Sequence, residues 1–549
     1  MKNYAYSFSK FGFAMLILLV ANAARVVAQE VSSAGEVKAA LRFIDIEKPS
    51  KAIESLKTLV NKYPTDATVF YALGYAYIKK GELDLASAEF DKGIKLNDKE
   101  PINYVGKGYI SLLKNNQADS KLNFDKAQAL AKKNTAVLNG IAEAYLSNKQ
   151  LAGGALDILL KSKSINAKDP ATLILLGDAY LQANDGGKSV SSYEDAAVVD
   201  PKNGKPHYKI GTVYNRSKNT TAAITAFEKA ISVDPEYAPA FRELGEIYYG
   251  KSEGEKAVKA QESYLNIIEN PESGKVQLFF YLFMAKNYSK ATEVFNQISS
   301  SPNLLPIAWK FDALLEKELN NFDKSIIAFE KYFSLAKREE IQASDYFNYA
   351  ECLTKAKKDS LSIIAYDNSL KLDSTQMKAL QQKADAEMKL KKYPDAIKTL
   401  IKLMSKRPQP MSIDHYTIGK AYLANNQLVE ADTMFSRLIR LQPAMPIGYV
   451  MEAKVKSIQD PEQKAGLAKA YYEKVIELGE SKPDRNKADL LQAYNYLATY
   501  SYNIEHDIAK TKMYYEKIIA LNPADTGAAT NLEILKKMEQ KKAAATKQP

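Results

Sequence analysis

The chain is poor in the residues on which most metal, disulfide and redox chemistry depends. Its 549 residues include one cysteine, three histidines and one tryptophan. The single Cys352 excludes an intrachain disulfide, a thiolate metal cluster and a paired redox motif. We expect it to be a small buried side chain on a helix. Glycine (24 residues) and proline (20 residues) are also scarce, which excludes a collagen-like or low-complexity chain.

Long apolar runs and a strong excess of one charge are absent as well. Beyond the N-terminus no segment approaches 18 apolar residues, so we expect a soluble mature protein without a membrane span. The 76 basic residues are scattered among 65 acidic ones, and the net charge is +11. This pattern favours a solvated mixed surface over a nucleic-acid site.

The N-terminus differs from the rest of the chain. Lys2 and Lys10 precede an apolar run over 11–24, and small residues in a cleavage pattern follow it. This arrangement predicts a signal peptide over 1–28 and therefore export. An uncleaved N-terminal anchor is the alternative.

What the chain does contain is a repeat with a period of 34 residues, counted from Ser33. Small residues recur at the eighth and twentieth positions of the unit, where they allow two helices to cross closely. The eighth position holds Ala40, Gly74, Gly108, Ala142, Gly177, Gly211, Gly245, Ala313, Ala350, Ala384, Gly419 and Ala453. The twentieth holds Ala52, Ala86, Ser120, Gly154, Ser189, Ala223, Ala257, Ala291, Ser325, Ser362, Ala396 and Ala431.

Large rings and prolines follow the same period. The twenty-fourth position holds Phe90, Phe124, Tyr193, Phe227, Phe295, Phe329, Tyr366 and Phe435. A proline marks the thirty-second position at Pro64, Pro201, Pro235, Pro408, Pro443 and Pro523, where it ends the second helix of a unit.

These residues resemble the tetratricopeptide repeat family over almost the whole chain that follows the leader. The resemblance implies an all-α fold, a right-handed α-solenoid of about 14 helical hairpins with a C-terminal capping helix. Each hairpin would bury its apolar face only against its neighbours. The expected segments are a signal peptide (1–28), an array of seven units (33–271), a second array that begins with a degenerate unit (272–477), a linker (478–491), a last unit with its capping helix (492–541) and a basic disordered tail (542–549).

No catalytic constellation emerges. Gly250 to Gly254 matches a nucleophile elbow, but that elbow must link a strand to a helix, and here a polar turn between helices is expected. His207 and His415 occupy the fourth position of their units, where other units carry aromatic rings, so we expect core packing for both. His506 falls in a turn. We therefore predict no enzyme activity, no cofactor and no metal.

The resemblance implies a binding groove on the first helix of each hairpin, mainly at the second, fifth, ninth and twelfth positions. These positions have no packing duty, so their chemistry reports on ligands. Tyrosine and arginine combine large contact area with hydrogen bonding, as binding hot spots do. The predicted groove residues are Tyr71, Tyr75, Tyr109, Asn139, Asp178, Tyr208, Asn215, Arg242 and Tyr249.

The leading hypothesis is therefore a non-catalytic interaction scaffold in the periplasm or envelope of a Gram-negative bacterium. It would bind extended peptides or partner proteins in the concave groove, within an assembly or secretion machine, and would bind no nucleic acid. A self-assembling structural element is one alternative. A glycan-binding or enzymatic role of an aromatic groove segment is an alternative of another class.

Overall fold

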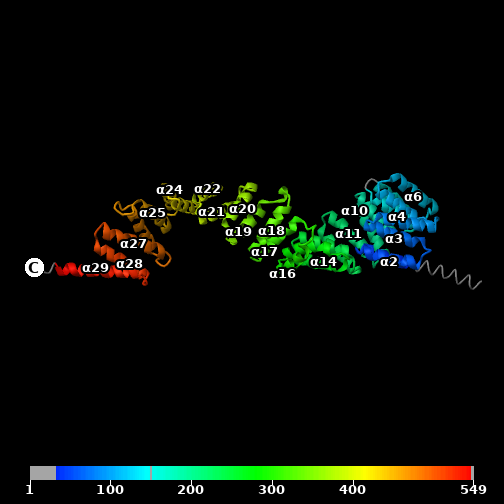
Figure 1. The fold of residues 1–549 in the computed structure, drawn as a ribbon. Coiled ribbons are helices and arrows are strands. Elements are labelled where there is room, and N and C mark those ends of the chain that lie inside the picture. Colours follow the sequence, from blue (N-terminus) through cyan, green and yellow to red (C-terminus); the bar gives the residue numbers. More distant parts are fainter. Residues whose placement is uncertain (1–32, 149–150, 546–549) are drawn as a thin grey trace, which may run out of the picture. The chain divides into compact units, whose positions relative to one another are not determined.

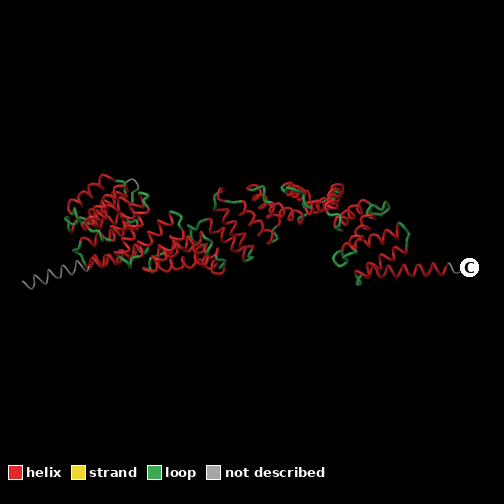
Figure 2. The backbone as a smooth tube through the Cα atoms, turned by 180° about the vertical axis from the view of Figure 1, so that it is seen from behind, coloured by secondary structure: helices red, strands yellow, loops and turns green. Residues whose placement is uncertain are grey.

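In the computed structural model, residues 33–148 and 151–545 are described, and their side chains as far as residue 541. The leader predicted over 1–28 lies outside this range. The described chain is helical throughout, with no strand in either range, which confirms the all-α prediction (Figures 1 and 2). The chain forms two compact units, Met1–Leu304 and Leu305–Pro549.

The first unit begins with a helix over 33–45. It continues with α2 (Pro49–Lys62), α3 (Ala67–Lys80), α4 (Leu83–Leu96), α5 (Ile102–Leu113), α6 (Gln117–Leu130), α7 (Thr135–Leu146), α8 (Ala152–Ile165), α9 (Pro170–Gln182), α10 (Gly186–Val199), α11 (Gly204–Arg216), α12 (Thr220–Val233), α13 (Ala238–Gly250), α14 (Gly254–Ile267), η1 (Pro271–Gly274), α15 (Lys275–Met284) and α16 (Tyr288–Ile298).

The second unit contains α17 (Pro306–Glu318), α18 (Phe322–Leu335), η2 (Arg338–Glu340), α19 (Ala343–Lys355), α20 (Asp359–Leu372), α21 (Met377–Lys389), α22 (Tyr393–Ser405), α23 (Ser412–Ala424), α24 (Leu428–Leu441), α25 (Pro446–Gln459), α26 (Lys469–Gly479), α27 (Lys487–Asn503), α28 (Ile508–Leu521) and α29 (Thr526–Ala545).

The core of each hairpin follows the predicted periodicity. The ring at the twenty-fourth position lies directly over the small residue at the eighth. A Cβ atom added to Gly211 would lie 2.6 Å from two ring carbons of Phe227, whose side chain is completely buried. The same close approach recurs at Gly74, Gly108, Gly177 and Gly419. A side chain larger than hydrogen at these glycines would therefore press against an aromatic ring.

The turn inside most of the described hairpins has a regular backbone conformation that residue types reveal only weakly. The fifteenth position is left-handed, with φ between 54 and 61° at Glu47, Asn115, Asn184, Lys218, Ser252, Lys286, Asn320, Lys357, Lys391, Asn426 and His506. Gly81 occupies the same position with φ of 85°. A left-handed residue just after a helix is a common way to end it, so this position stops the first helix of these twelve hairpins.

The segment boundaries differ in detail from those expected. The expected division at residues 271–272 lies inside the first unit, because α15 and α16 belong to that unit. In the expected linker, the stretch between α26 and α27 is not helical, but α27 already begins at Lys487. The capping helix α29 extends to Ala545, so the expected tail is helical over 542–545, and 546–549 lie outside the described residues. None of the described helices is both long and apolar enough to cross a membrane.

The expectation that each hairpin packs only against its neighbours is wrong for the first hairpin. The first hairpin also contacts the region from α11 to α14; the Nη2 atom of Arg42, for example, lies 2.7 Å from Oδ1 of Asp234. Ile46 is completely buried in an apolar cluster that includes Phe227 and Leu244. The array of the first unit therefore closes on its own beginning.

Candidate functional site

Three of the predicted groove residues, Tyr71, Tyr75 and Tyr109, lie in the interior of the first unit. Tyr71 and Tyr75 are stacked on α3 with ring centroids 6.2 Å apart, and Tyr109 on α5 is only 6% exposed. The Tyr75 hydroxyl donates a 2.6 Å hydrogen bond to Oε1 of Glu143 on α7, and burial raises the pKa of Tyr75 well above its ordinary value. Lys79 Nζ lies 2.7 Å from the same carboxylate oxygen. Tyr75, Lys79 and Glu143 therefore already satisfy one another.

Asn139 is a buried link between two hairpins. Its amide nitrogen donates to Asp169 at 2.8 Å, and its amide oxygen accepts hydrogen bonds from the hydroxyls of Ser162 and Thr172 at 2.9 Å each. Both polar atoms of the amide are therefore engaged, as a buried amide requires.

Asp178 and Tyr208 are also engaged within the unit. Asp178 accepts hydrogen bonds from the Tyr193 hydroxyl at 2.7 Å and from Lys209 Nζ at 2.9 Å. The ring of Tyr208 lies 5.6 Å from that of Phe227, centroid to centroid. Aromatic pairs at such distances stabilise the packing of a core.

The last three predicted groove residues lie on α11 and α13. Asn215 is half-buried near the end of α11. Arg242 forms an ion pair with Glu47 of the first hairpin, and the Tyr249 ring lies 5.0 Å from that of Tyr281. None of the nine predicted groove residues is exposed. A role for them in binding a partner therefore remains a prediction.

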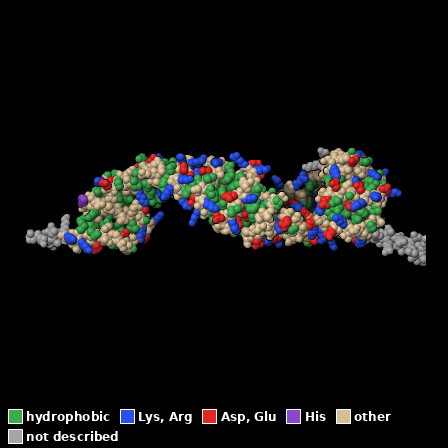
Figure 3. All heavy atoms as spheres, viewed as in Figure 1, with side chains coloured by type: hydrophobic (Ala, Val, Ile, Leu, Met, Phe, Trp, Pro, Cys, Tyr) green, Lys and Arg blue, Asp and Glu red, His purple; other side chains and the backbone are tan. Residues whose placement is uncertain are grey.

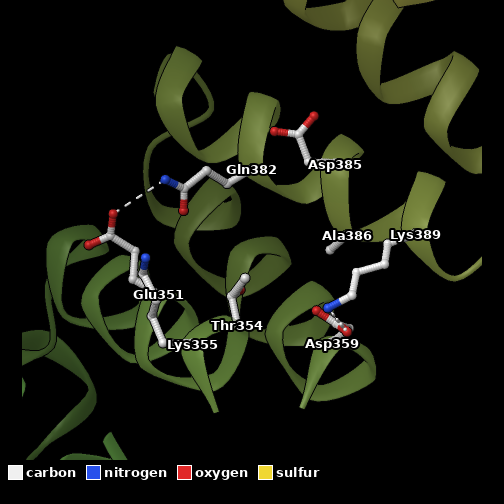
Figure 4. A pocket seen from close by; sticks show the side chains of 8 residues that line it. All are labelled: Glu351, Thr354, Lys355, Asp359, Gln382, Asp385, Ala386 and Lys389. Atoms are coloured by element: carbon white, nitrogen blue, oxygen red, sulfur yellow. Dashed lines mark hydrogen bonds and ion pairs between the residues drawn. The ribbon is translucent and has the colours of Figure 1, made fainter. Parts of the chain in front are cut away.

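The same first-helix positions are arranged differently in the second unit, where they surround an open hollow. A cavity of about 280 Å³ lies between α19 and α21 (Figure 4). Its lining residues come mainly from these first helices of two adjacent hairpins: Glu351, Thr354, Lys355, Asp359, Gln382, Asp385, Ala386 and Lys389. Glu351 and Asp385 hold the ninth position of their units, and Thr354 holds the twelfth. The volume suits a side chain or a short segment of peptide better than a cofactor.

Charges of both signs line this α19–α21 cavity. Glu351 is held by Lys317 at 2.6 Å and by Lys378 at 2.9 Å. Burial alone would raise the pKa of Glu351, but the two ammonium groups outweigh burial and lower it.

The other acidic side chains of the cavity are paired differently. Asp359 is paired with Lys389 at 2.6 Å. Asp385 is exposed, accepts a 3.0 Å hydrogen bond from Gln381, and forms no ion pair with any described residue. The cavity therefore presents one carboxylate that is free to meet a cation.

Sequence reasoning placed the groove in the first unit and overlooked this cavity, although the signal was present. The position rule that selected Tyr75 and Tyr109 also selects Glu351, Asp385 and Thr354. The prediction missed this cavity because it favoured tyrosine and arginine, whereas the side chains that line the cavity are polar rather than aromatic.

The histidines occupy the kinds of surroundings expected from the repeat. His415 is 6% exposed and His207 is half-buried, and burial lowers the pKa of both. His506 is exposed at a left-handed turn. The motif from Gly250 to Gly254 joins α13 to α14, so it is a turn between two helices. Within the described residues, no three His, Cys, Asp or Glu side chains are placed to hold a metal ion.

The face drawn in Figure 3 carries basic and acidic side chains interspersed over both units, without a large area of one sign. This distribution agrees with the mixed surface predicted from the sequence. Long-range attraction of a nucleic acid would need a continuous basic surface instead.

The hairpin geometry and the repeat positions agree with comparisons to known proteins. The sequence profile described as "Tetratricopeptide repeat" matches residues 67–100 and 205–237. The C-terminal part of a TPR repeat-containing protein from Cytophaga hutchinsonii is 31% identical, with 47% of this chain and 99% of that chain covered and a TM-score of 0.40. No curated protein matches the chain.

More distant similarities extend along the chain. YrrB, described as a TPR protein with an unusual peptide-binding site, is 22% identical over 35% of this chain and 98% of that one, with a TM-score of 0.23. Yeast Tom70 is 12% identical over 73% of this chain and 96% of that one, with a TM-score of 0.27.

The fold thus defines an α-solenoid of helical hairpins, a class that generally serves as a non-catalytic scaffold for interactions with proteins or peptides. Within that class, the chain belongs to the tetratricopeptide repeat family.

Proposed function

We propose that this protein is a non-catalytic scaffold that binds an extended segment of a partner protein along the first helices of its second unit. The α19–α21 cavity carries this proposal. It joins two adjacent hairpins on the face formed by first helices, and its lining includes the exposed side chains of Asp385 and Lys355. A partner segment with a basic side chain that enters the cavity would meet Asp385.

The chemistry of the lining favours a peptide over a small apolar ligand. Three carboxylates and two ammonium groups surround the cavity, together with the amide of Gln382 and the hydroxyl of Thr354. Such groups hydrogen bond to peptide N–H and C=O groups as well as to charged side chains. Of the eight lining residues only Ala386 has an apolar side chain, whereas sites for drug-like ligands are lined mainly by hydrophobic and aromatic side chains.

Panning of a displayed random-peptide library on the purified full-length protein tests the proposal. We expect enrichment of peptides rich in Lys or Arg, and a double variant, Asp385→Asn with Glu351→Gln, should lose at least 10-fold in affinity for them. The matched control is Asp395→Asn with Glu430→Gln, which removes the same charge from exposed second-helix positions. Equal loss in the two double variants, or no enrichment on the wild type, would refute this site.

We also propose that the protein acts in the periplasm of a Gram-negative bacterium, as part of an envelope complex. The basic residues and apolar run of the leader support export. Mass spectrometry of the protein purified from its native host should find Gln29 at or near the mature N-terminus. Recovery of an intact Met1 would contradict it.

A further inference from the structure

The turn of the first hairpin is bound by the first unit much as a peptide ligand would be. Glu47 forms an ion pair with Arg242 of α13 and accepts a 2.6 Å hydrogen bond from the Tyr264 hydroxyl of α14. Asp45 Oδ1 lies 2.7 Å from Nζ of Lys205 on α11. Lys205 and Arg242 hold the second and fifth positions of their units, which are groove positions in this family. The carboxylates of Asp45 and Glu47 therefore form ion pairs with two cationic groove residues.

An aliphatic side chain anchors the turn between these two carboxylates. Ile46 is 0% exposed and belongs to one apolar cluster with Phe227, Tyr237, Ala240 and Leu244 of the surrounding helices. A fully buried side chain of this size contributes substantially to the affinity of a docked segment. The pattern that is recognised is thus acidic, aliphatic, acidic.

Contacts on both sides fix the direction of the turn. Before it, Arg42 reaches Asp234 at 2.7 Å and Glu236 at 3.1 Å. After it, Glu269 accepts hydrogen bonds from the backbone N–H groups of Ser50 and Lys51, at 3.0 and 3.3 Å. These N–H groups belong to the first turn of α2, which its own N-cap side chain leaves uncapped. A carboxylate at this place satisfies donors that a helix itself cannot.

We propose that the surface formed by Lys205, Arg242 and Tyr264 is a second recognition site, specific for an acidic–aliphatic–acidic segment, and that Asp45-Ile46-Glu47 occupies it in cis. A partner protein that carries the same pattern competes for this surface. Because the occupant is tethered, it acts at a high effective concentration, and a partner binds tightly only when the tethered turn is weakened or displaced. This site lies in the first unit and is independent of the α19–α21 cavity.

The test uses the full-length protein and a fluorescein-labelled peptide with the sequence of residues 40–51. The opened variant carries Ile46→Ala and Glu47→Gln, which weaken the tethered turn and leave the receiving surface unchanged. Fluorescence anisotropy should give at least 10-fold tighter peptide binding to the opened variant than to the wild type. Addition of Arg242→Gln to the opened variant should weaken binding at least 10-fold again.

A mismatched peptide with Asp45→Asn, Ile46→Ser and Glu47→Gln is the control for specificity. An opened variant that keeps its helical circular dichroism and binds both peptides equally, or neither, would overturn the proposal.

If the opened variant loses helicity, hydrogen exchange of the single variant Glu47→Gln decides. Exchange should then be at least 10-fold faster over residues 42–51 and unchanged in α4. Unchanged protection over 42–51 would show that the carboxylate is not recognised, and the proposal would fall.

Discussion

The close approach of helix and ring in each hairpin gives a quantitative prediction for Gly211→Ala. The new Cβ would lie 2.6 Å from two ring carbons of Phe227, whereas carbon atoms that are not bonded prefer about 3.5–4.0 Å. The ring is completely buried, so it can give way only by moving its neighbours. Overpacking of this kind costs about 1–3 kcal/mol.

Helix propensity works in the opposite direction, since alanine is favoured over glycine by at most about 1 kcal/mol inside a helix. The net change in stability for Gly211→Ala is therefore a loss of about 0–2 kcal/mol. Gly153→Ala serves as the matched control, because Gly153 lies in α8 and a Cβ atom added to it would have no neighbouring atom within 4 Å. The control should be neutral or stabilised, so the difference between the two variants isolates the packing cost of about 1–3 kcal/mol.

Native-state hydrogen exchange is the appropriate assay, because repeat arrays unfold locally and a single unfolding midpoint is not well defined. Slowly exchanging amides of α11 and α12 should lose protection in Gly211→Ala, while those of α8 should not lose protection in Gly153→Ala. Addition of Phe227→Leu to Gly211→Ala should cost less than the sum of the single changes, because the clash partner is gone. Equal changes of protection in Gly211→Ala and Gly153→Ala, each relative to the wild type, would refute the argument.

Three further predictions concern stability. Burial, and to a smaller extent the carboxylate of Glu316, raise the pKa of Asp312 from 3.8 to about 7. The stability that the protonated Asp312 contributes to the folded state is therefore fully present below about pH 3.8 and is lost as the pH rises through 7. Asp312→Asn should therefore stabilise the α17–α18 hairpin at pH 8 by about 2–4 kcal/mol and not at pH 3.5; a difference that does not vary with pH contradicts this. A fragment that ends at Leu304 should stay helical and monodisperse by circular dichroism and gel filtration, whereas one that ends at Gly211 should aggregate; equal behaviour counts against the unit boundary. His207→Phe should change stability by less than about 0.5 kcal/mol if the imidazole only fills space, and a larger loss would assign the ring a polar role.

The sequence predicted the hairpins well because packing between neighbours leaves a periodic record. Small residues such as Gly211, and rings such as Phe227, recur because each hairpin meets the same steric requirement. The left-handed conformation of the fifteenth position is not accompanied by a residue type that recurs as regularly as those of the core. Gly81 is the one glycine there, and Lys218 and Ser252 adopt the same conformation, since the surrounding hairpin imposes it. Residue propensity is too weak a signal when tertiary packing decides the backbone.

The closure of the first unit could not be predicted from the repeat. A small rotation from each hairpin to the next sets how far apart distant hairpins lie, and the rotations accumulate along the array. Residue types determine the contacts between neighbouring hairpins, but they do not determine the total rotation that accumulates along the array. Arg242 was predicted to line the groove, and the structure pairs it with Glu47 from the same chain.

The rule that predicted the groove residues therefore holds only where the array of hairpins does not curve back on itself. The rule assumes that the second, fifth, ninth and twelfth positions are free because the hairpin core does not use them. In the first unit the array returns on itself, so Glu143 and Glu47 engage Tyr75 and Arg242 from other hairpins. In the second unit the ninth position holds Asp385, which remains exposed beside a cavity. The same residue positions thus serve closure in one unit and access in the other. For this reason we place the binding of an extended partner segment in the second unit, whereas a partner of the first unit would have to displace the turn that already occupies its site.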